Sequence, residues 1–275
     1  MKLNGKTLVI TGAASGIGRA LVMEAVRRGC SVAMADLDFE GVSETCREAE
    51  ALGRDSTRVT AHELDVASLD NWRRFRDEAS RDHETLDGII NNAGITFAGT
   101  IEDTGYEKFE ALMSVNFMGM VYGSKEFLPL LESRPSAAIV NVSSLFGLIP
   151  AKSHAAYCSS KFAIRGFTET LAIELADTNI SVSSVHPGHI GTDIVTNAHK
   201  RGDVVPDDYP PEYIETYARE FKKRGLSPIK AAEIILNGLE KQSEQILVGR
   251  DAQMTLLLKR LAPKPLNTVL SRFIG

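Results

Sequence analysis

Short apolar runs alternate along the chain with longer segments in which apolar residues recur at helical spacing. Several runs show little alternation of polar and apolar positions, which is typical of parallel strands covered by helices on both faces. The predicted strands are Thr7–Thr11, Ser31–Ala35, Arg58–Leu64, Leu86–Asn91, Ala137–Ser143, Ile180–Val185 and Gln245–Val248. The predicted helices are Ile17–Val26, a polar helix ending near Leu52, Leu69–Arg81, Lys108–Leu131, Ala155–Leu175 and Ile229–Gln242. We therefore predict one doubly wound α/β domain over residues 1–275, with a mostly parallel seven-stranded sheet.

Two segments depart from this alternation. Residues 190–227 contain Pro206, Pro210, Pro211 and mixed charges, and are interpreted as an insertion beyond the sixth strand. Residues 252–275 are basic and contain no acid. Apolar residues recur there at helical spacing, at Leu266, Val269, Leu270, Phe273 and Ile274. This amphipathic tail is expected to dock on the body or on a neighbouring subunit, in preference to an anionic membrane surface.

The composition excludes several classes of protein. Of 275 residues 43% are hydrophobic and 24% charged, as in soluble globular proteins, and the net charge of −5 does not favour nucleic-acid binding. No run reaches the roughly 18 apolar residues of a membrane span. Three cysteines without a C-x-x-C pair suggest a reducing compartment, so we expect a cytoplasmic protein. The six histidines show no metal-ligand spacing, and no metal site is predicted.

A glycine-rich turn follows the first predicted strand. In Thr11–Gly18 the glycines follow the spacing G-x-x-x-G-x-G, which allows a sharp turn and close approach to a pyrophosphate at a helix N-terminus. Asp36 ends the next strand, where a carboxylate binds ribose hydroxyls and repels a 2′-phosphate. We favour NAD over NADP, although Arg19 would suit a 2′-phosphate; a turn that binds nothing is the alternative. Asp65 and Val66 are placed to contact adenine, with helix capping an equal interpretation.

Three polar residues form a second candidate site. Tyr157 and Lys161 are four residues apart in a predicted helix and share one face. A neighbouring ammonium is expected to lower the pKa of the phenol from about 10, so that it can exchange a proton with an alcohol or carbonyl oxygen. Ser144 precedes that helix and can bind the same oxygen. A surface helix pair is the alternative for Tyr157 and Lys161 taken alone.

The ordered motifs resemble the short-chain dehydrogenase/reductase family, closely over residues 5–190 and loosely beyond. The motifs that carry the resemblance are Thr11-Gly12-x-x-x-Gly16-x-Gly18, Asn91-Asn92-Ala93-Gly94, Asn116, Ser144, Tyr157-x-x-x-Lys161 and Pro187-Gly188-x-x-x-Thr192. The resemblance implies a Rossmann-type fold and an NAD-dependent oxidoreductase that transfers hydride between a secondary alcohol or ketone and the nicotinamide. An NADPH-dependent carbonyl reductase is the second possibility. A non-catalytic dinucleotide sensor is a third, but it would typically have lost Tyr157 or Lys161.

The resemblance also implies a role for each motif. Tyr157 is expected to be the general acid/base, Lys161 to bind the nicotinamide ribose and Ser144 to orient the substrate oxygen. Asn116 is expected to shape the central helix and hold a water beside Lys161. The expected cofactor contacts are Gly12, Ser15, Gly16, Ile17, Gly18, Asp36, Asp65, Val66, Asn92, Ala93, Gly94, Tyr157, Lys161, Pro187, Gly188, Ile190 and Thr192.

Substrate contacts are expected after Ser144, beside Tyr157 and beyond Thr192. The side chains there are mostly apolar: Leu145, Phe146, Leu148, Ile149, Ile190, Ile194 and Val195. We therefore expect a lipophilic alcohol or ketone, the alternative being that these side chains close the core. Phe146, His154 and His189 are the candidate pocket residues. Residues 190–227 are interpreted as a substrate lid, mobile over 193–226, and a homodimer or homotetramer is expected.

Overall fold

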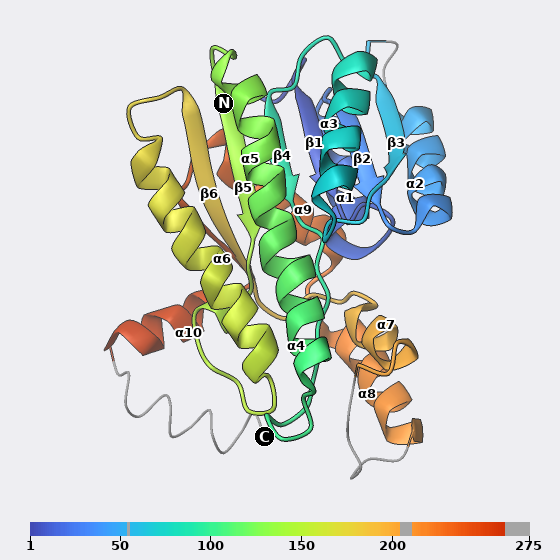
Figure 1. Cartoon of the computed structure of the whole chain (residues 1–275), viewed down its shortest axis with the longest axis vertical. Coiled ribbons are helices and arrows are strands. Elements are labelled where there is room, and N and C mark those ends of the chain that lie inside the picture. Colours follow the sequence, from blue (N-terminus) through green and yellow to red (C-terminus); the bar gives the residue numbers. More distant parts are fainter. Residues whose placement is uncertain (54–55, 204–210, 262–275) are drawn as a thin grey trace.

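A parallel sheet forms the centre of the computed structural model, which describes residues 1–53, 56–203 and 211–261 (Figure 1). Within these residues the sheet has seven strands: β1 (Thr7–Thr11), β2 (Ser31–Asp36), β3 (Val59–Glu63), β4 (Gly88–Asn91), β5 (Ala137–Val142), β6 (Ile180–Pro187) and β7 (Gln245–Val248). Their order is β3-β2-β1-β4-β5-β6-β7. The order reverses between β1 and β4, and in such sheets ligands bind at the carboxyl ends of the strands beside this point. The predicted fold class is confirmed.

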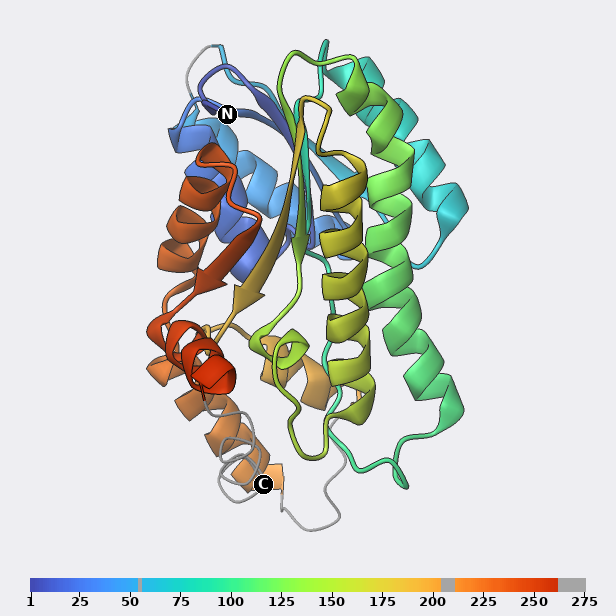
Figure 2. The same cartoon turned by 90° about the vertical axis from the view of Figure 1, so that its left-hand side faces the viewer.

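Helices cover both faces of the sheet (Figure 2). On one face lie α1 (Gly16–Arg27), α2 (Phe39–Leu52) and α9 (Pro228–Glu240). On the other lie α3 (Leu69–Asp82), α5 (Gly119–Glu132) and α6 (Ala155–Glu174). Each face has its own apolar core, the second built around Trp72, Phe75 and Phe127. Because both faces are covered, every residue of β1, β4 and β5 is buried, which explains their continuous apolar runs.

The predicted helix over Lys108–Leu131 is interrupted. The structure has α4 (Tyr106–Met113), then a π-helical turn over Ser114–Met118, then α5. The buried Asn116 lies in that turn, and its amide bonds both backbone groups of Ile95. These contacts with Ile95, about 20 residues earlier in the chain, coincide with the wider turn. In a π-helical turn each hydrogen bond spans one residue more than in an α-helix, and one such turn leaves no clear periodicity in the sequence.

The segments beyond β6 differ most from expectation. Residues 190–227 contain two helices within their described part, α7 (Ile194–Lys200) and α8 (Pro211–Arg224). After β7 comes α10 (Arg250–Leu261), which overlaps the start of the predicted amphipathic tail, although the predicted helical spacing begins only further along the chain; most of its apolar residues are exposed. The predicted tail positions from Leu266 to Ile274 lie outside the described residues. In the described parts of the chain, no helix combines the length and apolar character needed to cross a membrane.

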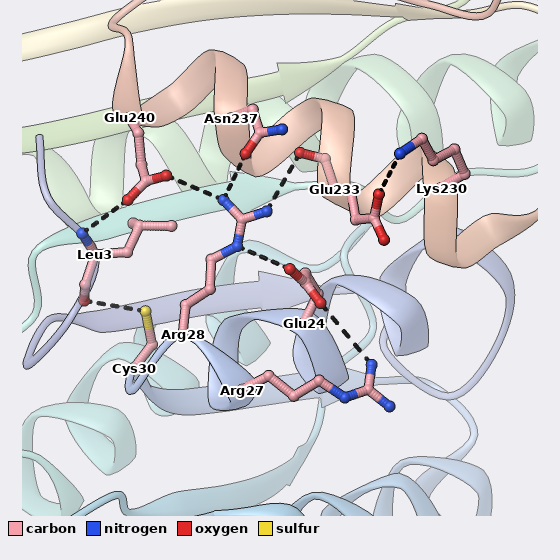
Figure 3. Close-up of polar contacts among 9 residues, drawn as sticks. All are labelled: Leu3, Glu24, Arg27, Arg28, Cys30, Lys230, Glu233, Asn237 and Glu240. Atoms are coloured by element: carbon pink, nitrogen blue, oxygen red, sulfur yellow. Dashed lines mark hydrogen bonds and ion pairs between the residues drawn. The ribbon is translucent and has the colours of Figure 1, made fainter.

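Arg28, directly after α1, joins α1 to α9 (Figure 3). Its Nε donates to Glu24 Oε1 at 2.9 Å, and its Nη1 donates to Asn237 Oδ1 at 2.9 Å and to Glu240 Oε2 at 3.0 Å. Glu240 Oε1 in turn accepts from the backbone N–H of Leu3 at 3.4 Å. This cluster lies at the end of α1 opposite the glycine turn, so it holds two helices together without contributing to the candidate site.

Asp87 joins the chain segments that lead into β1 and β4. Its carboxylate, 1% exposed, accepts from Lys6 Nζ, Thr7 N and Arg134 Nε, each at 3.0 Å. Although burial acts to raise it, these donors hold the pKa of Asp87 below its usual value. The amino ends of the two central strands are therefore tied together by one buried carboxylate.

Candidate active site

The glycine turn between β1 and α1 packs closely against the segment after β4. Gly12 and Gly16 have φ of +67° and +57°, a conformation that favours glycine. A Cβ on Gly12 would lie 2.8 Å from Ala93 Cα, and one on Gly18 would lie 1.9 Å from the Gly12 carbonyl oxygen. The Ser15 side chain does not cap α1. The first N–H groups of the helix are thus not bonded by that side chain, and a helix N-terminus of this kind suits an anion.

Asn92 and Thr11 hold this turn in place. Asn92 Nδ2 donates to the carbonyl oxygens of Thr11 at 2.9 Å and Gly12 at 3.3 Å. Thr11 Oγ1 accepts from the backbone N–H groups of Asn92 and Ala93, each at 3.1 Å. Asn92 therefore holds the turn through hydrogen bonds in which Thr11 is its partner.

Asp36, at the end of β2, lies beside the glycine turn. Its Oδ2 accepts from Ala14 N at 2.9 Å and its Oδ1 from Asp38 N at 3.0 Å. Burial raises the pKa of this carboxyl, and the two backbone donors oppose that effect. Arg19, the side chain that would suit a 2′-phosphate, forms an ion pair with Glu48 of α2. The Asp36 carboxylate is thus present at the turn, whereas the Arg19 guanidinium is paired with Glu48.

Asp65 and Val66 make local contacts. Asp65 Oδ1 accepts from Ala67 N at 2.9 Å, whereas the residue that caps α3 is Ser68. The carbonyl oxygen of Val66, which is itself buried, accepts from Trp72 Nε1 at 3.0 Å. Capping of α3 by Asp65 is therefore wrong, and the adenine contact stays a prediction.

Ser144, Tyr157 and Lys161 lie together at the carboxyl end of β5. Ser144 follows β5, and Tyr157 and Lys161 are in the first two turns of α6. The Ser144 side chain lies close enough to the Tyr157 phenol to act on its pKa as a hydrogen-bond partner. Lys161, 4% exposed, donates from Nζ to the Val142 carbonyl oxygen at 3.1 Å, and this nitrogen lies 5.6 Å from the centre of the Tyr157 ring. The alternative of a surface helix pair is therefore wrong.

Burial dominates the acid–base properties of this group. It raises the pKa of Tyr157 to about 12, against the opposing effect of the Ser144 hydrogen bond. It also lowers the pKa of Lys161 to about 8. The prediction that Lys161 lowers the pKa of the phenol is wrong for this structure. The physical reason is that removal from water disfavours both charged forms, and the amine lies over the face of the ring.

Asn116 is buried beside Lys161. Its Oδ1 accepts from Ile95 N at 2.8 Å, and its Nδ2 donates to Ile95 O at 2.9 Å and to Ser160 Oγ at 3.1 Å. A Cβ on Gly94 would lie 3.1 Å from Asn116 Oδ1 and 3.4 Å from Lys161 Nζ. The expected role in shaping the helix agrees with these contacts, and the water beside Lys161 stays a prediction.

The segment after β6 lies on the other side of the glycine turn. A Cβ on Gly16 would lie 3.3 Å from the Thr192 methyl carbon, and one on Gly188 would lie 2.1 Å from Asp251 Oδ2. The same Asp251 oxygen accepts from His189 N at 2.6 Å. Asp251, in the first turn of α10, thus supports the predicted nicotinamide segment. We missed it, although its position just after β7 follows the rule that such sites lie at carboxyl strand ends.

The candidate substrate residues separate into two groups. The Phe146 ring lies 5.4 Å from that of His154 and 6.2 Å from that of Tyr157, so these three are together. His189 instead packs on Phe221 of α8 at 4.1 Å, and its Nε2 contacts the Phe221 carbonyl oxygen at 2.7 Å. The structure therefore places His189 at the base of the 190–227 segment.

The apolar residues predicted to face the substrate also divide. Three of them are fully enclosed by protein, as expected if they close the core: Leu148, Ile149 and Ile190. The other four are partly exposed: Leu145, Phe146, Ile194 and Val195. A cavity of about 350 Å³ lies between α7 and α8 and is lined by Asp193, Thr196, His199, Glu215, Ala218, Arg219 and Lys222. All of these lining residues except Ala218 are polar or charged types, and Tyr157 is not among them.

The comparison with known proteins agrees with this arrangement. The family model for short chain dehydrogenase matches residues 6–202. The chain belongs to the short-chain dehydrogenase/reductase family. It is 38% identical over 261 residues to SadH of Mycobacterium tuberculosis, named as an oxidoreductase, covering 94% of this chain and 91% of that one. It is also 32% identical over 191 residues to cyclopentanol dehydrogenase of Comamonas testosteroni, covering 70% and 75% of the two chains.

Solved structures of the family have the same fold. A short-chain dehydrogenase/reductase from Burkholderia phymatum in complex with NAD superposes with a TM-score of 0.85 at 24% identity, covering 96% of each chain. A short-chain dehydrogenase from Novosphingobium aromaticivorans gives 0.79 at 25% identity, covering 96% of this chain and 88% of that one. The protein is therefore an oxidoreductase of the short-chain dehydrogenase/reductase type, whose fold binds a nicotinamide cofactor.

Proposed function

We propose that this enzyme is an NAD-dependent dehydrogenase/reductase that interconverts lipophilic secondary alcohols and ketones. The observation that carries the proposal is the convergence of Ser144, Tyr157 and Lys161 at the carboxyl end of β5. When bound, the nicotinamide would exchange hydride with the substrate carbon. The residues that we propose to hold the cofactor are those of the glycine turn, Asp36 and those of the Pro187–Thr192 segment.

Tyr157 moves the proton in this proposal. With a pKa of about 12 the phenol is protonated at neutral pH, which suits donation to a ketone oxygen during reduction. The Ser144 hydroxyl, which lies beside the phenol, orients the substrate oxygen. For alcohol oxidation the phenol must first lose its proton, so we expect oxidation to accelerate as the pH rises. Lys161, held by the Val142 carbonyl, is placed to bind a ribose hydroxyl.

Replacing the phenol tests the catalytic assignment. Tyr157→Phe removes the transferable proton and keeps the ring, and we expect kcat to fall by about 10² to 10⁴ with little change in cofactor affinity. Tyr106→Phe is the matched control, because Tyr106 is 89% exposed in α4, and it should leave kcat unchanged. Turnover by Tyr157→Phe close to that of the unmodified enzyme would overturn the proposal.

The preference for NAD rests on Asp36. Its carboxylate accepts from Ala14 N in the glycine turn, and a 2′-phosphate placed there would meet a like charge. Asp36→Asn keeps the shape and removes the charge, so the ratio of kcat/KM for NAD+ over NADP+ should fall at least about 10-fold. Asp38→Asn, two residues away at the N-terminus of α2, is the control. A higher kcat/KM with NADP+ in the unmodified enzyme would support the NADPH-dependent carbonyl reductase instead.

The substrate class is supported by the partly exposed apolar residues after Ser144 and by the similarity to cyclopentanol dehydrogenase. A screen of cyclic and long-chain secondary alcohols with NAD+, followed by absorbance of the reduced nicotinamide, tests it. Preference for small polyols or sugars would contradict it. We also expect a cytoplasmic homodimer or homotetramer, and light scattering of the purified protein would measure the subunit number.

A further inference from the structure

The backbone pairing between β5 and β6 stops just before Ser144. The register of the two strands ends with Val142 opposite Val185, and Ser143 N donates to Val185 O at 2.8 Å. Two residues further along β6 is Pro187, whose ring nitrogen carries no hydrogen and cannot donate to β5. The chain therefore reaches Ser144 at a point where β6 has no further backbone donor to offer.

The side chain of His186 supplies a donor at this point. Its Nδ1 lies 3.0 Å from the Ser144 carbonyl oxygen, and its Nε2 lies 2.9 Å from Ser184 Oγ. A carbonyl can only accept, so Nδ1 carries the proton. Nε2 of the neutral ring then accepts from the Ser184 hydroxyl. Both partners select the same tautomer of a ring that is 0% exposed.

The surroundings keep this ring neutral. Burial lowers the pKa of His186 to about 4. Two cations, Arg165 and Lys161, also act to lower it. The Ser144 carbonyl and Glu169 act in the opposite direction. At neutral pH the ring is therefore an uncharged donor to Ser144.

We propose that His186 is a positioning residue that fixes the backbone of Ser144, and through it the hydroxyl that faces Tyr157. This inference rests on the proposed function. Other contacts hold the two residues before Ser144, since Lys161 Nζ bonds the Val142 carbonyl and Ser143 Oγ bonds the Lys161 carbonyl. His186 holds the carbonyl of Ser144 itself, one residue beyond those anchors.

Two substitutions of similar shape separate positioning from packing. In His186→Asn the amide nitrogen takes the place of Nδ1 and can still donate to Ser144, whereas His186→Leu has no donor. Both variants lose the ring and the bond to Ser184, so they should be destabilised similarly. We expect kcat to fall by about 10- to 100-fold in His186→Leu and by no more than about three-fold in His186→Asn, because small misplacements of a reacting group are costly. The KM for the cofactor should change in neither.

Hydrogen exchange measured by mass spectrometry provides a readout that does not depend on turnover. Backbone amides over residues 144–149 should exchange faster in His186→Leu than in His186→Asn. If His186→Leu does not fold, His186→Gln replaces it, since its amide can reach Ser184 but is too long to donate from the Nδ1 position. The kcat of His186→Gln should then be lower than that of His186→Asn, and its amides over residues 144–149 should exchange faster.

The outcomes are distinct. Equal losses of kcat in the Asn variant and in the donor-free variant, or faster exchange with no loss of kcat, would overturn the positioning role. If the unmodified enzyme oxidises no alcohol and reduces no ketone, the proposed function fails. The exchange comparison then still decides whether His186 holds Ser144, and equal exchange in the variants would overturn that contact as well.

Discussion

Arg28→Met would remove the side chain that joins α1 to α9 (Figure 3). The Arg28 and Glu24 side chains are 18% and 15% exposed, so their hydrogen bond is largely shielded from water and should contribute about 1.5 to 3 kcal/mol. Glu240 is 37% exposed, and its pair with Arg28 should add less than about 1 kcal/mol. Methionine retains the apolar part of the side chain. We therefore expect the free energy of unfolding to fall by about 2 to 3 kcal/mol and Tm by roughly 5 to 10 °C.

Urea unfolding followed by circular dichroism measures this change. The matched control is Arg27→Met, because the Arg27 side chain is 48% exposed and lies 3.8 Å from Glu24, so its loss should cost less than about 0.5 kcal/mol. The KM for the cofactor should be unchanged in both variants, since the cluster lies at the far end of α1 from the glycine turn. Equal stability of the two variants would refute the reasoning.

Three further predictions follow from buried groups. Burial lowers the pKa values of His83 and His186 from 6.5 to about 4. Because the unfolded chain binds these protons first, each histidine should cost about 3 kcal/mol of stability as the pH falls from 6.5 to 4, measurable by urea unfolding across that range. Gly18→Ala would place a methyl group against the Gly12 carbonyl oxygen, and calorimetric titration should show at least about a 10-fold weaker cofactor Kd. Asp87→Asn leaves two partly buried cations, Lys6 and Arg134, without their carboxylate and should lower the free energy of unfolding by about 3 kcal/mol in chemical denaturation.

The order of strands and helices could be predicted because local patterns carry it. β1, β4 and β5 are buried on both faces and appear in the sequence as continuous apolar runs. Asp36 was predicted at the end of its strand, and the structure places it beside the glycine turn. Ser144, Tyr157 and Lys161 were likewise predicted to meet, since a strand end and the next helix are adjacent in this topology.

Other parts of the site depend on contacts between distant segments. Asp251 reaches the His189 backbone from a helix 62 residues further along the chain, and His186 reaches Ser144 over 42 residues. The raised pKa of Tyr157 arises from the protein around it and opposes what its neighbour four residues away would suggest. Nothing in the local pattern distinguishes Leu148, which is enclosed, from Leu145, which is partly exposed.

The residue pattern of this chain thus specifies which segments become strands and helices, and which polar groups stand at the carboxyl end of the sheet. Those properties follow from periodicity and from the chemistry of each side chain. Protonation states, the π-helical turn at Asn116 and the support of Ser144 by His186 were decided when distant segments packed together. The physical reason is that desolvation and hydrogen-bond geometry depend on which atoms surround a group, and those atoms are set by long-range contacts.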